Sequence, residues 1–553
     1  MKKHLSLLAI FTLCAMLASC GSDPATSTAS SGSTTSTETS TATSDIFNET
    51  GFPIVNEPVT LKVWGPETIQ GDYNTLLSTT YYEEMTGVHI EWDQYSSTMD
   101  GNEAFNLLIA SGDLPDIMGS GYSTEQVAMC IEGDIVIPLN DLIDKYGTNF
   151  QKALEEQPQY VDMLTAPDGN IYNFMYTDVG VHKDSEYKMW VYTDWLEKLN
   201  MEAPTTPEEF KEMLIAFKEQ DPNGNGQADE LGLVGFYNGR QSDPICYLMN
   251  AFELYNTNYY TITDDKKINF VANTDGWRDG LRYLNDLYES GLIEEETYVQ
   301  DKTQFQALLN KPAGETIVGT FPFWYQGDAI DTSVLKWTDY QAIAPLKGPT
   351  GLQQTAARKG GGFALNNMIT TKCEYPEVAF RWLDYLVSEE GNFFTQFGVE
   401  GETYEWVDQP AFNGSDKALK ATKENVSGTI LWNSGYFPRY DSVDVRYATV
   451  DDEALRDTDN TYVLYSAAKI YEPYYVWHNI PDVVWNSDAD IANAKADYQV
   501  SFNEYIAATD TAFVLGNLDI DNDADWQNYL DTLNSMGLDQ YIETLEKFYG
   551  LTE

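Results

Sequence analysis

The chain has few cysteines and histidines and a marked shortage of basic residues. Its 553 residues include five cysteines and four histidines, and 32 lysines and arginines stand against 87 acidic residues. Cys130, Cys246 and Cys373 lie far apart and no Cys-x-x-Cys pair occurs, so we expect neither a disulfide nor a structural zinc site. The net charge of −55 repels phosphate, which argues against nucleic acid as a partner.

Motifs of the common enzyme classes are also missing. The sequence contains no GxSxG, HExxH, P-loop or GxGxxG motif. The histidines are isolated in the sequence, which argues against nucleophilic catalysis with a histidine base. A glycosidase, however, needs only two carboxylates in a cleft, and acidic residues are abundant. We expect no catalytic residues, and a secreted glycoside hydrolase is the first alternative.

After the first 20 residues, no apolar run approaches the length of a transmembrane helix. The start combines Lys2 and Lys3 with a short apolar run over residues 5–17, which predicts a secretory signal peptide over residues 1–19. Its ending, Leu-Ala-Ser-Cys20, resembles the bacterial lipoprotein processing box. That resemblance implies diacylation of Cys20, palmitate included, and cleavage just before it. The alternative is an ordinary signal peptide followed by a chance cysteine.

A low-complexity tract follows Cys20. Residues 21–44 are almost wholly Ser, Thr, Ala and Gly, which cannot bury apolar area. We expect residues 20–54 to form a lipidated, flexible tether. The protein is then held on the extracytoplasmic face of the cell membrane through its lipid anchor only.

Alternating strand and helix patterns begin the folded part. Strand-like runs at 60–64, 88–92 and from 116 are separated by helical patterns over 74–86 and around 105–109. Such alternation predicts an α/β fold with a mainly parallel sheet. The folded part is long enough for two or three domains. Thr206 to Glu209 predicts a capping box at the start of another helix.

Oxygen-bearing side chains recur at alternate positions of one loop. Residues 221–230 read Asp-Pro-Asn-Gly-Asn-Gly-Gln-Ala-Asp-Glu, which fits the first half of the EF-hand pattern. Gly232 stands where that pattern has its bidentate Glu. We expect a structural Ca²⁺ site here, because a hard cation needs six to eight oxygens on a curled loop. The alternative is a metal-free Asn-Gly turn. The expected ligands are Asp221, Asn223, Asn225, Gln227, Asp229 and Glu230.

Several segments resemble one protein family in number and order. They are 112–117 (GDLPDI), 193–199 (TDWLEKL), 204–206 (PTT), 221–230 (DPNGNGQADE), 291–293 (GLI), 376–379 (PEVA) and 398–404 (GVEGETY). The chain resembles the family-1 extracellular solute-binding proteins of bacterial ABC importers, in the LipO-like lipoprotein branch. One departure is Val191-Tyr192, where the family commonly has Ile-Arg near Trp190.

The resemblance implies a two-lobe, periplasmic-binding-protein-like α/β fold with mainly parallel sheets flanked by helices and a hinge between the lobes. We expect residues 55–175 with about 345–395 in the N-terminal lobe, and 176–344 with about 396–553 in the C-terminal lobe. The resemblance also implies a glycan in the cleft and calcium on the 221–230 loop. The expected partners are an oligosaccharide and the permease subunits of an ABC transporter, and the protein is expected to be a monomer.

Aromatic side chains near strand ends are the candidates for the glycan site. A sugar needs flat apolar platforms and a polar rim, and 13% of the residues are aromatic. Doubly wound sheets open their ligand crevice outside the carboxyl ends of the strands. The expected lining residues are Trp64, Ser120, Tyr122, Trp190, Trp324, Tyr325, Glu400, Tyr404 and Trp406. A receptor for a peptide or a cell-wall fragment is the second alternative.

Overall fold

The computed structural model describes residues 46–67, 72–96, 98–236, 241–312, 314–358, 362–423, 430–432, 437–455, 457, 460–486 and 488–552. The expected signal peptide, Cys20 and the low-complexity tract therefore lie outside the described residues. Part of residues 46–54, which we expected to belong to the tether, is packed instead. Ile54 is fully buried, and the ring of Phe47 meets that of Tyr146 edge-on.

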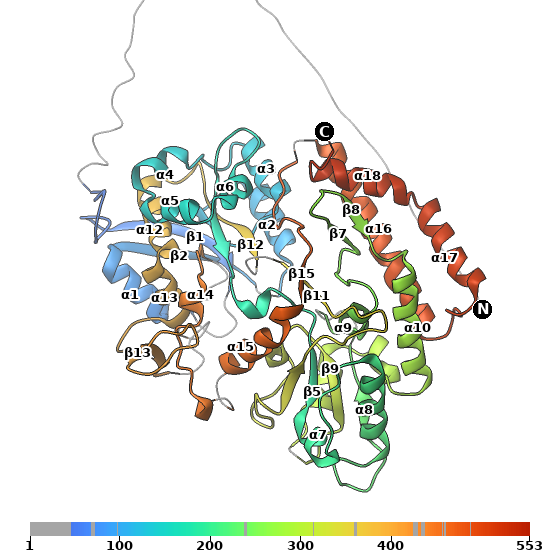
Figure 1. The fold of residues 1–553 in the computed structure, drawn as a ribbon. Coiled ribbons are helices and arrows are strands. Elements are labelled where there is room, and N and C mark those ends of the chain that lie inside the picture. Colours follow the sequence, from blue (N-terminus) through green and yellow to red (C-terminus); the bar gives the residue numbers. More distant parts are fainter. Residues whose placement is uncertain are drawn as a thin grey trace, which may run out of the picture. The chain divides into compact units, whose positions relative to one another are not determined.

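Two mixed sheets organise the chain from residue 46 onward (Figure 1). The first has the strand order β2-β1-β3-β12-β4 and the second has the order β10-β5-β9-β6. The strands of the first sheet are β1 (Val59–Pro66), β2 (Val88–Tyr95), β3 (Ile117–Met118), β4 (Asn173–Thr177) and β12 (Phe363–Ile369). Those of the second are β5 (Met189–Tyr192), β6 (Leu231–Leu233), β9 (Val318–Pro322) and β10 (Tyr340–Ile343).

Each sheet contains one reversed strand. In the first, β1 pairs in parallel with β2 and β3, while β12 is antiparallel to β3 and β4. In the second, β6 and β9 are parallel, while β5 is antiparallel to β9 and β10. The reversed strands β5 and β12 are those that the chain forms first after passing from one sheet to the other. The α/β fold class is confirmed, and the sheets are mixed because each receives one strand from such a crossing.

Three two-stranded ribbons and the helices complete the fold. The ribbons are β7 (Tyr260–Ile262) with β8 (Ile268–Phe270), β11 (Thr355–Ala357) with β15 (Tyr475–Trp477), and β13 (Tyr404–Val407) with β14 (Ala418–Ala421). The helices are α1 (Leu77–Thr86), α2 (Gly101–Ser111), α3 (Thr124–Glu132), α4 (Asn140–Tyr146), α5 (Thr148–Glu156), α6 (Gln159–Leu164), α7 (Thr193–Leu199), α8 (Pro207–Glu219), α9 (Ile245–Leu248), α10 (Asp275–Glu289), α11 (Lys302–Leu309), α12 (Pro376–Val387), α13 (Glu389–Phe397), α14 (Val443–Arg446), α15 (Asn460–Tyr471), α16 (Ala489–Val514), α17 (Asp523–Ser535) and α18 (Leu538–Phe548).

Local sequence signals set several helix ends. Gly87 ends α1 and Gly112 ends α2, each in the left-handed conformation (φ of 75° and 69°) that glycine adopts without steric cost. The capping box expected at α8 forms only in part. The Thr206 side chain accepts the Glu209 backbone N–H, but the Glu209 carboxylate takes the N–H and hydroxyl of Thr205 rather than the N–H of Thr206.

Each sheet has its own hydrophobic core. The first core, around the first sheet, includes buried residues from Ile54 to Met175 and from Phe363 to Phe394. The second core, around the second sheet, includes residues from Tyr187 to Leu346 and from Val463 to Leu545. We call each sheet with its core a lobe. None of the described helices is long and apolar enough to cross a bilayer, and Cys130, Cys246 and Cys373 are free thiols.

The expected lobe boundary near residue 396 needs a correction. Trp432 and Phe437, which we expected in the C-terminal lobe, are buried in the first core. The Trp432 ring packs on Trp382, and its indole N–H donates to the Thr79 hydroxyl. Long-range aromatic packing of this kind leaves no local pattern in the sequence, so the boundary could not be seen there.

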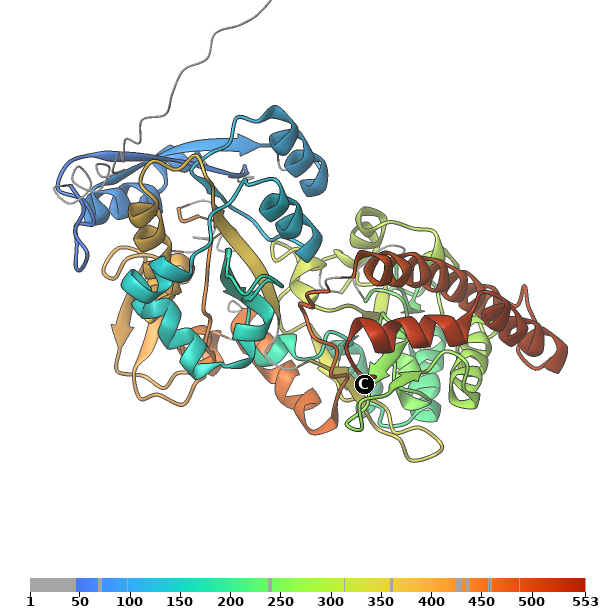
Figure 2. The same cartoon turned by 90° about the horizontal axis from the view of Figure 1, so that it is seen from above.

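The C-terminal helices belong to the second lobe. In Figures 1 and 2, the red helices α16 to α18 lie beside the green α10, away from the blue strands β1 and β2. The indole N–H of Trp277 on α10 donates to Asp510 on α16 at 3.1 Å. Arg278 and Arg282 form ion pairs with Asp523 and Asp521, which fasten the acidic segment 519–525 to α10.

Candidate functional site

A pocket lies where β1, β2 and β3 end. Trp64 is near the carboxyl end of β1, Tyr95 ends β2, and Ser120 follows β3. The first turns of α2 and α3 supply polar groups beside them. Parallel strands present their carboxyl ends at one edge of a sheet, which is why the residues after them meet. The cavity, of about 130 Å³, is lined by Trp64, Tyr95, Gly101, Asn102, Phe105, Ser120, Gly121, Tyr122 and Gln126.

Trp64 is the central aromatic of this pocket. Its ring centroid lies 4.7 Å from that of Tyr95, with the rings tilted by 33°. Trp64 is 5% exposed, so most of its surface packs on the first core, whereas Tyr95 is half-buried. The other side of Trp64 borders a narrow recess lined by Val63, Gly65, Pro66, Tyr73, Trp92, Gln94, Gly119 and Phe437.

The backbone at Ser120 is strained. Its φ of 135° lies in a region that residues other than glycine rarely adopt. Hydrogen bonds on both sides hold it there: the Gly119 N–H donates to the Trp64 carbonyl at 2.7 Å, and the Tyr122 N–H donates to the Leu365 carbonyl at 2.8 Å. Strain of this kind concentrates at ligand sites, where the fold keeps a group in a fixed direction.

The pocket can stack and hydrogen-bond, but it carries no charge. The described residues that line it and the adjoining recess are all uncharged, in a chain whose net charge is −55. The Gln126 amide donates to Asn102 at 3.2 Å and accepts the Ser123 N–H at 2.9 Å, so both amides are held in place. Burial raises the pKa of Tyr122 well above its usual value, which keeps its hydroxyl neutral.

Trp324 and Tyr325 form a second aromatic pair, in the turn after β9. Their ring centroids are 5.0 Å apart, and both side chains are half-buried. Trp324 packs against the second core. The Tyr325 hydroxyl accepts a hydrogen bond from the Asn460 amide, and burial raises the pKa of Tyr325 to about 12.

The other expected lining residues lie elsewhere. Trp190 is fully buried within β5, between β9 and β10, and its indole N–H donates to the Phe323 carbonyl at 2.9 Å. Its side chain therefore packs in the second core and offers no face to a ligand. Glu400, Tyr404 and Trp406 belong to the β13–β14 ribbon and its approach, where Tyr404 is buried and Trp406 is 38% exposed.

The sequence analysis missed six lining residues of the pocket: Tyr95, Gly101, Asn102, Phe105, Gly121 and Gln126. Tyr95 could have been found, because it ends a strand parallel to β1. Asn102 and Gln126 carry a weaker signal, namely polar residues in the first turn of helices that follow such strands. Phe105 is indistinguishable in sequence from a core residue.

The 221–230 loop is curled as a cation site requires. Gly224 and Gly226 have φ of 76° and 73°, and the Gly226 N–H donates to an Asp221 carboxylate oxygen at 3.0 Å. The Asn223 and Asn225 amides donate to the Asp229 carboxylate at 3.1 Å. Within the described residues, no group of three or more His, Cys, Asp or Glu side chains is placed to hold a metal.

Some carboxylate oxygens of this loop are nevertheless buried and unpaired. Both carboxylate oxygens of Glu230 and one of Asp221 are buried and make no hydrogen bond, and Glu230 is 4% exposed. Burial raises the pKa of Glu230, and the carboxylates of Asp229 and Asp221 add to the shift, whereas nearby backbone N–H groups oppose it. Buried carboxylates without partners are costly, and a divalent cation would remove that cost.

Comparison with known proteins gives a family and well-matched relatives. Residues 65–393 match the model of a family described as bacterial extracellular solute-binding protein. The chain is 30% identical over 501 residues to the fructooligosaccharide ABC transporter substrate-binding protein FusA of Streptococcus pneumoniae serotype 4, covering 86% of this chain and 87% of FusA. It is 26% identical over 340 residues to lipoprotein LipO of Bacillus subtilis, covering 59% of this chain and 63% of LipO.

Two solved structures share the fold over nearly their whole length. The structure of S. pneumoniae FusA in complex with kestose has a TM-score of 0.71 and 28% identity, covering 89% of this chain and 99% of that one. A FusA EF-hand mutant in complex with fructo-nystose has the same TM-score and coverage, at 27% identity.

Proposed function

The chain belongs to the bacterial extracellular solute-binding proteins, and on that premise we propose that it is a receptor for a neutral oligosaccharide. It delivers this ligand to the permease subunits of an ABC transporter and catalyses no reaction. The relatives support this function, since FusA is a fructooligosaccharide ABC transporter substrate-binding protein. They favour a receptor over the alternative of a glycoside hydrolase.

The observation that carries the proposal is the uncharged aromatic pocket at the edge of the first sheet. Trp64 and Tyr95 offer apolar surface to the flat face of a sugar, and the fixed amides of Asn102 and Gln126 offer donors and acceptors to its hydroxyls. A uronate would bring carboxylates that this lining cannot pair with a basic side chain. We therefore propose a neutral glycan rather than an acidic one.

The second lobe contributes the opposing contacts in this proposal. Trp324 and Tyr325 follow β9 of the second sheet, as Trp64 stands at the end of β1 in the first. Rotation of the lobes about a hinge brings the two groups onto one ligand. We keep Glu400, Tyr404 and Trp406 as candidate glycan contacts outside the pocket, because the 38% exposed Trp406 offers a stacking surface.

We propose Ca²⁺ as a structural ion of the 221–230 loop. Asp221, Asp229 and Glu230 would supply carboxylate oxygens, and Asn223, Asn225 and the Gln227 carbonyl would supply neutral ones. The unpaired oxygens of Asp221 and Glu230 support this assignment. A solved structure of the relative FusA is of an EF-hand mutant, which supports the proposal.

We also propose that Cys20 carries the lipid anchor and that the protein acts as a monomer on the extracytoplasmic face of the cell membrane. The processing-box sequence supports the anchor, as does the name of the relative LipO, a lipoprotein. Mass spectrometry of the membrane-extracted protein tests this proposal, since an unmodified N-terminus or a chain that still contains residues 1–19 would contradict it.

Calorimetric titration of residues 46–553, one compact unit, tests the ligand. The panel contains kestose, maltotriose, trigalacturonate and a muropeptide, each with product analysis. Binding of a neutral trisaccharide that is recovered intact is the expected result. Binding of trigalacturonate alone would contradict the neutral-glycan proposal, cleavage would indicate a hydrolase, and binding of the muropeptide alone would indicate a cell-wall-fragment receptor.

A further inference from the structure

Three chain segments lie together at the junction of the two lobes; two of them cross from one lobe to the other, and the third leaves and re-enters the second lobe. The first connecting segment (residues 178–188) links β4 to β5, and the second (344–362) links β10 to β12. The third (472–488) lies between α15 and α16. Ribbon pairing joins the second to the third, because β11 and β15 are parallel neighbours. Rotation of one lobe against the other must be accommodated where the chain crosses between them, which is in the first and second segments and between Phe437 and Val463.

The third connecting segment is fastened to both lobes. On the second lobe, the Ile262 N–H donates to the His478 carbonyl at 2.9 Å, and the Asn479 amide donates to the Ile262 carbonyl at 3.0 Å. On the first lobe, the Trp485 indole N–H donates to the Met163 carbonyl at 2.8 Å, and the Trp485 ring packs on the first core. Residues 478–485 therefore form a strap across the hinge.

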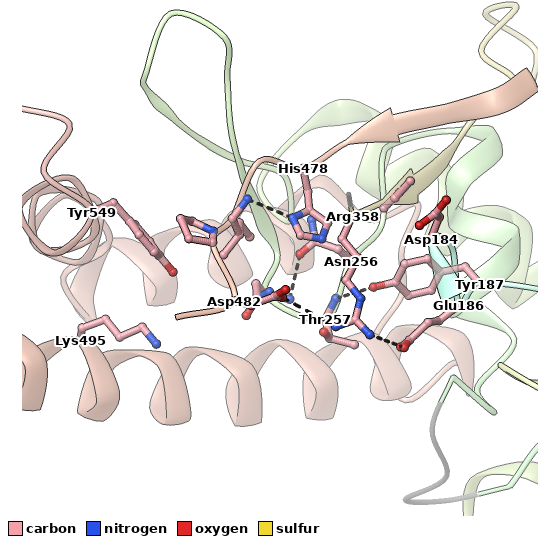
Figure 3. Close-up of a pocket in the computed structure, with 15 residues that line it drawn as sticks. Asp184, Glu186, Tyr187, Asn256, Thr257, Arg358, His478, Asp482, Lys495 and Tyr549 are labelled. Atoms are coloured by element: carbon pink, nitrogen blue, oxygen red, sulfur yellow. Dashed lines mark hydrogen bonds and ion pairs between the residues drawn. The ribbon is translucent and has the colours of Figure 1, made fainter. Parts of the chain in front are cut away.

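Arg358 connects all three segments. Its backbone N–H donates to the Asp184 carbonyl at 2.9 Å, and its guanidinium donates to Glu186 at 3.1 Å, both in the first connecting segment. The same guanidinium lies 3.9 Å from a carboxylate oxygen of Asp482 on the strap. Figure 3 shows Arg358 between these two carboxylates. Asp482 in turn accepts the N–H of Phe363, the first residue of β12.

The surroundings of Arg358 strengthen its ion pairs and leave its guanidinium room to move. The Arg358, Glu186 and Asp482 side chains are 31%, 16% and 22% exposed, so solvent screens them less than ordinary surface ion pairs. A cavity of about 290 Å³ borders them and leaves room for the guanidinium to shift. The Asp482 contact is too long for a hydrogen bond, whereas the Glu186 contact is one.

We propose that Arg358 restrains the hinge between the lobes, because it holds the first connecting segment to the strap through Glu186 and Asp482. It thereby limits the relative orientations of the lobes in the protein that binds the ligand. Arginine suits this role because its planar fork can engage two carboxylates at once, which a lysine ammonium does less well. The effect on affinity rests on the proposed function, whereas the effect on the ligand-free protein does not.

Restricting the lobes favours binding through preorganisation. A receptor whose lobes sample many orientations must lose that freedom when the ligand closes it, and the loss reduces affinity. Arg358 contacts no residue of the aromatic pocket in the described interactions, so it acts on the ligand only through the hinge. It is a positioning residue.

The test compares Arg358→Gln, Glu186→Gln and Asp482→Asn with the double variant Arg358→Gln/Glu186→Gln. Arg282→Gln is the matched control, because Arg282 also bridges two carboxylates, Asp279 and Asp521, but both belong to the second lobe. Small-angle scattering of the ligand-free protein measures lobe separation. Hydrogen exchange measures opening of residues 355–358 and 476–482, with α8 as the internal reference.

In the ligand-free protein, Arg358→Gln is expected to increase the radius of gyration and to speed exchange about tenfold in those two stretches but not in α8. The double variant is expected to match Arg358→Gln, because the two residues share one interaction. Arg358→Lys should increase the radius of gyration and the exchange rate less than Arg358→Gln does. Scattering and exchange like those of the unmodified protein, or faster exchange throughout the chain, would overturn the proposal.

Kestose titration then tests the link to binding. Arg358→Gln is expected to weaken binding about fivefold or more through a slower association rate, while Arg282→Gln binds as the unmodified protein does. If the unmodified protein itself binds no glycan, the proposed ligand is wrong, yet the ligand-free measurements still decide the role of Arg358. A looser hinge with unchanged kestose affinity would overturn the claim that Arg358 sets the binding orientation.

Discussion

The ring of Tyr325 lies directly against Gly327, in the short turn that follows β9. A Cβ atom on residue 327 would overlap the Cζ and Oη atoms of that ring. The Tyr325 hydroxyl is held from another direction by the Asn460 amide. Close approach to a glycine therefore fixes the direction of an aromatic side chain that we propose contacts the glycan.

Gly327→Ala is expected to displace the Tyr325 ring and to weaken neutral-trisaccharide binding about tenfold, which corresponds to about 1.4 kcal/mol. Calorimetric titration measures the affinity, and a melting curve shows that the variant folds. Asp328→Ala is the control, since it changes the same turn without filling the space beside the ring. Unchanged affinity for Gly327→Ala would remove Tyr325 from the site.

Tyr95→Ala tests the pocket of the first lobe. Loss of a half-buried ring that packs 4.7 Å from Trp64 should cost about 2 kcal/mol of binding, or roughly thirtyfold in Kd. The matched control is Tyr81→Ala, whose ring lies on α1 outside both pocket linings and is 39% exposed. Equal effects of the two substitutions would show that the pocket does not hold the ligand.

Calcium should reverse the order of melting temperatures between the unmodified protein and the variant Glu230→Gln. In chelator, Glu230→Gln is expected to melt no lower than the unmodified protein, because it removes a buried carboxylate without a partner. With calcium at a hundredfold excess over Kd, the unmodified protein gains about 2.7 kcal/mol and the variant gains much less. Asp523→Asn, at the first residue of α17, serves as the control. A calcium-independent melting temperature of the unmodified protein would rule out the site.

The buried Lys188 predicts a pH dependence of stability. Burial lowers its pKa from 10.5 to about 7, although the nearby Asp184 acts in the opposite direction, and its ammonium donates to the His182 carbonyl at 2.9 Å. Between pH 7 and 10.5 the unfolded chain binds this proton more tightly than the folded one. The contribution of Lys188 to the free energy of unfolding therefore rises with pH through that window.

Lys188→Met should remove this contribution, so the difference in unfolding free energy between the unmodified protein and the variant is expected to rise by up to about 1.4 kcal/mol per pH unit. Urea unfolding at pH 7, 8 and 9 measures it. Lys152→Met, at a 64% exposed side chain, is the control. Parallel pH profiles for the unmodified protein and Lys188→Met would contradict the prediction.

Much of the pocket was predictable because it follows from strand direction. Trp64, Ser120 and Tyr122 stand at or after the ends of strands that run in parallel, and the structure brings all three to one cavity. The same argument gave the wrong result for Trp190. This residue lies in β5, a reversed strand in the middle of the second sheet, and its side chain is fully buried. A strand's position in its sheet depends on pairing between distant segments, which short-range patterns do not contain.

The sequence by itself determined the α/β class, the glycine-ended helices, the oxygen-rich loop at 221–230 and the family resemblance, because each depends on residues close together in the chain. Tertiary structure decided the rest. It placed Trp432 in the first core, left the Glu230 carboxylate buried without a partner, and set Arg358 between Glu186 and Asp482. The positions of Trp432 and Arg358 depend on contacts across more than a hundred residues, whose geometry arises only when the sheets assemble.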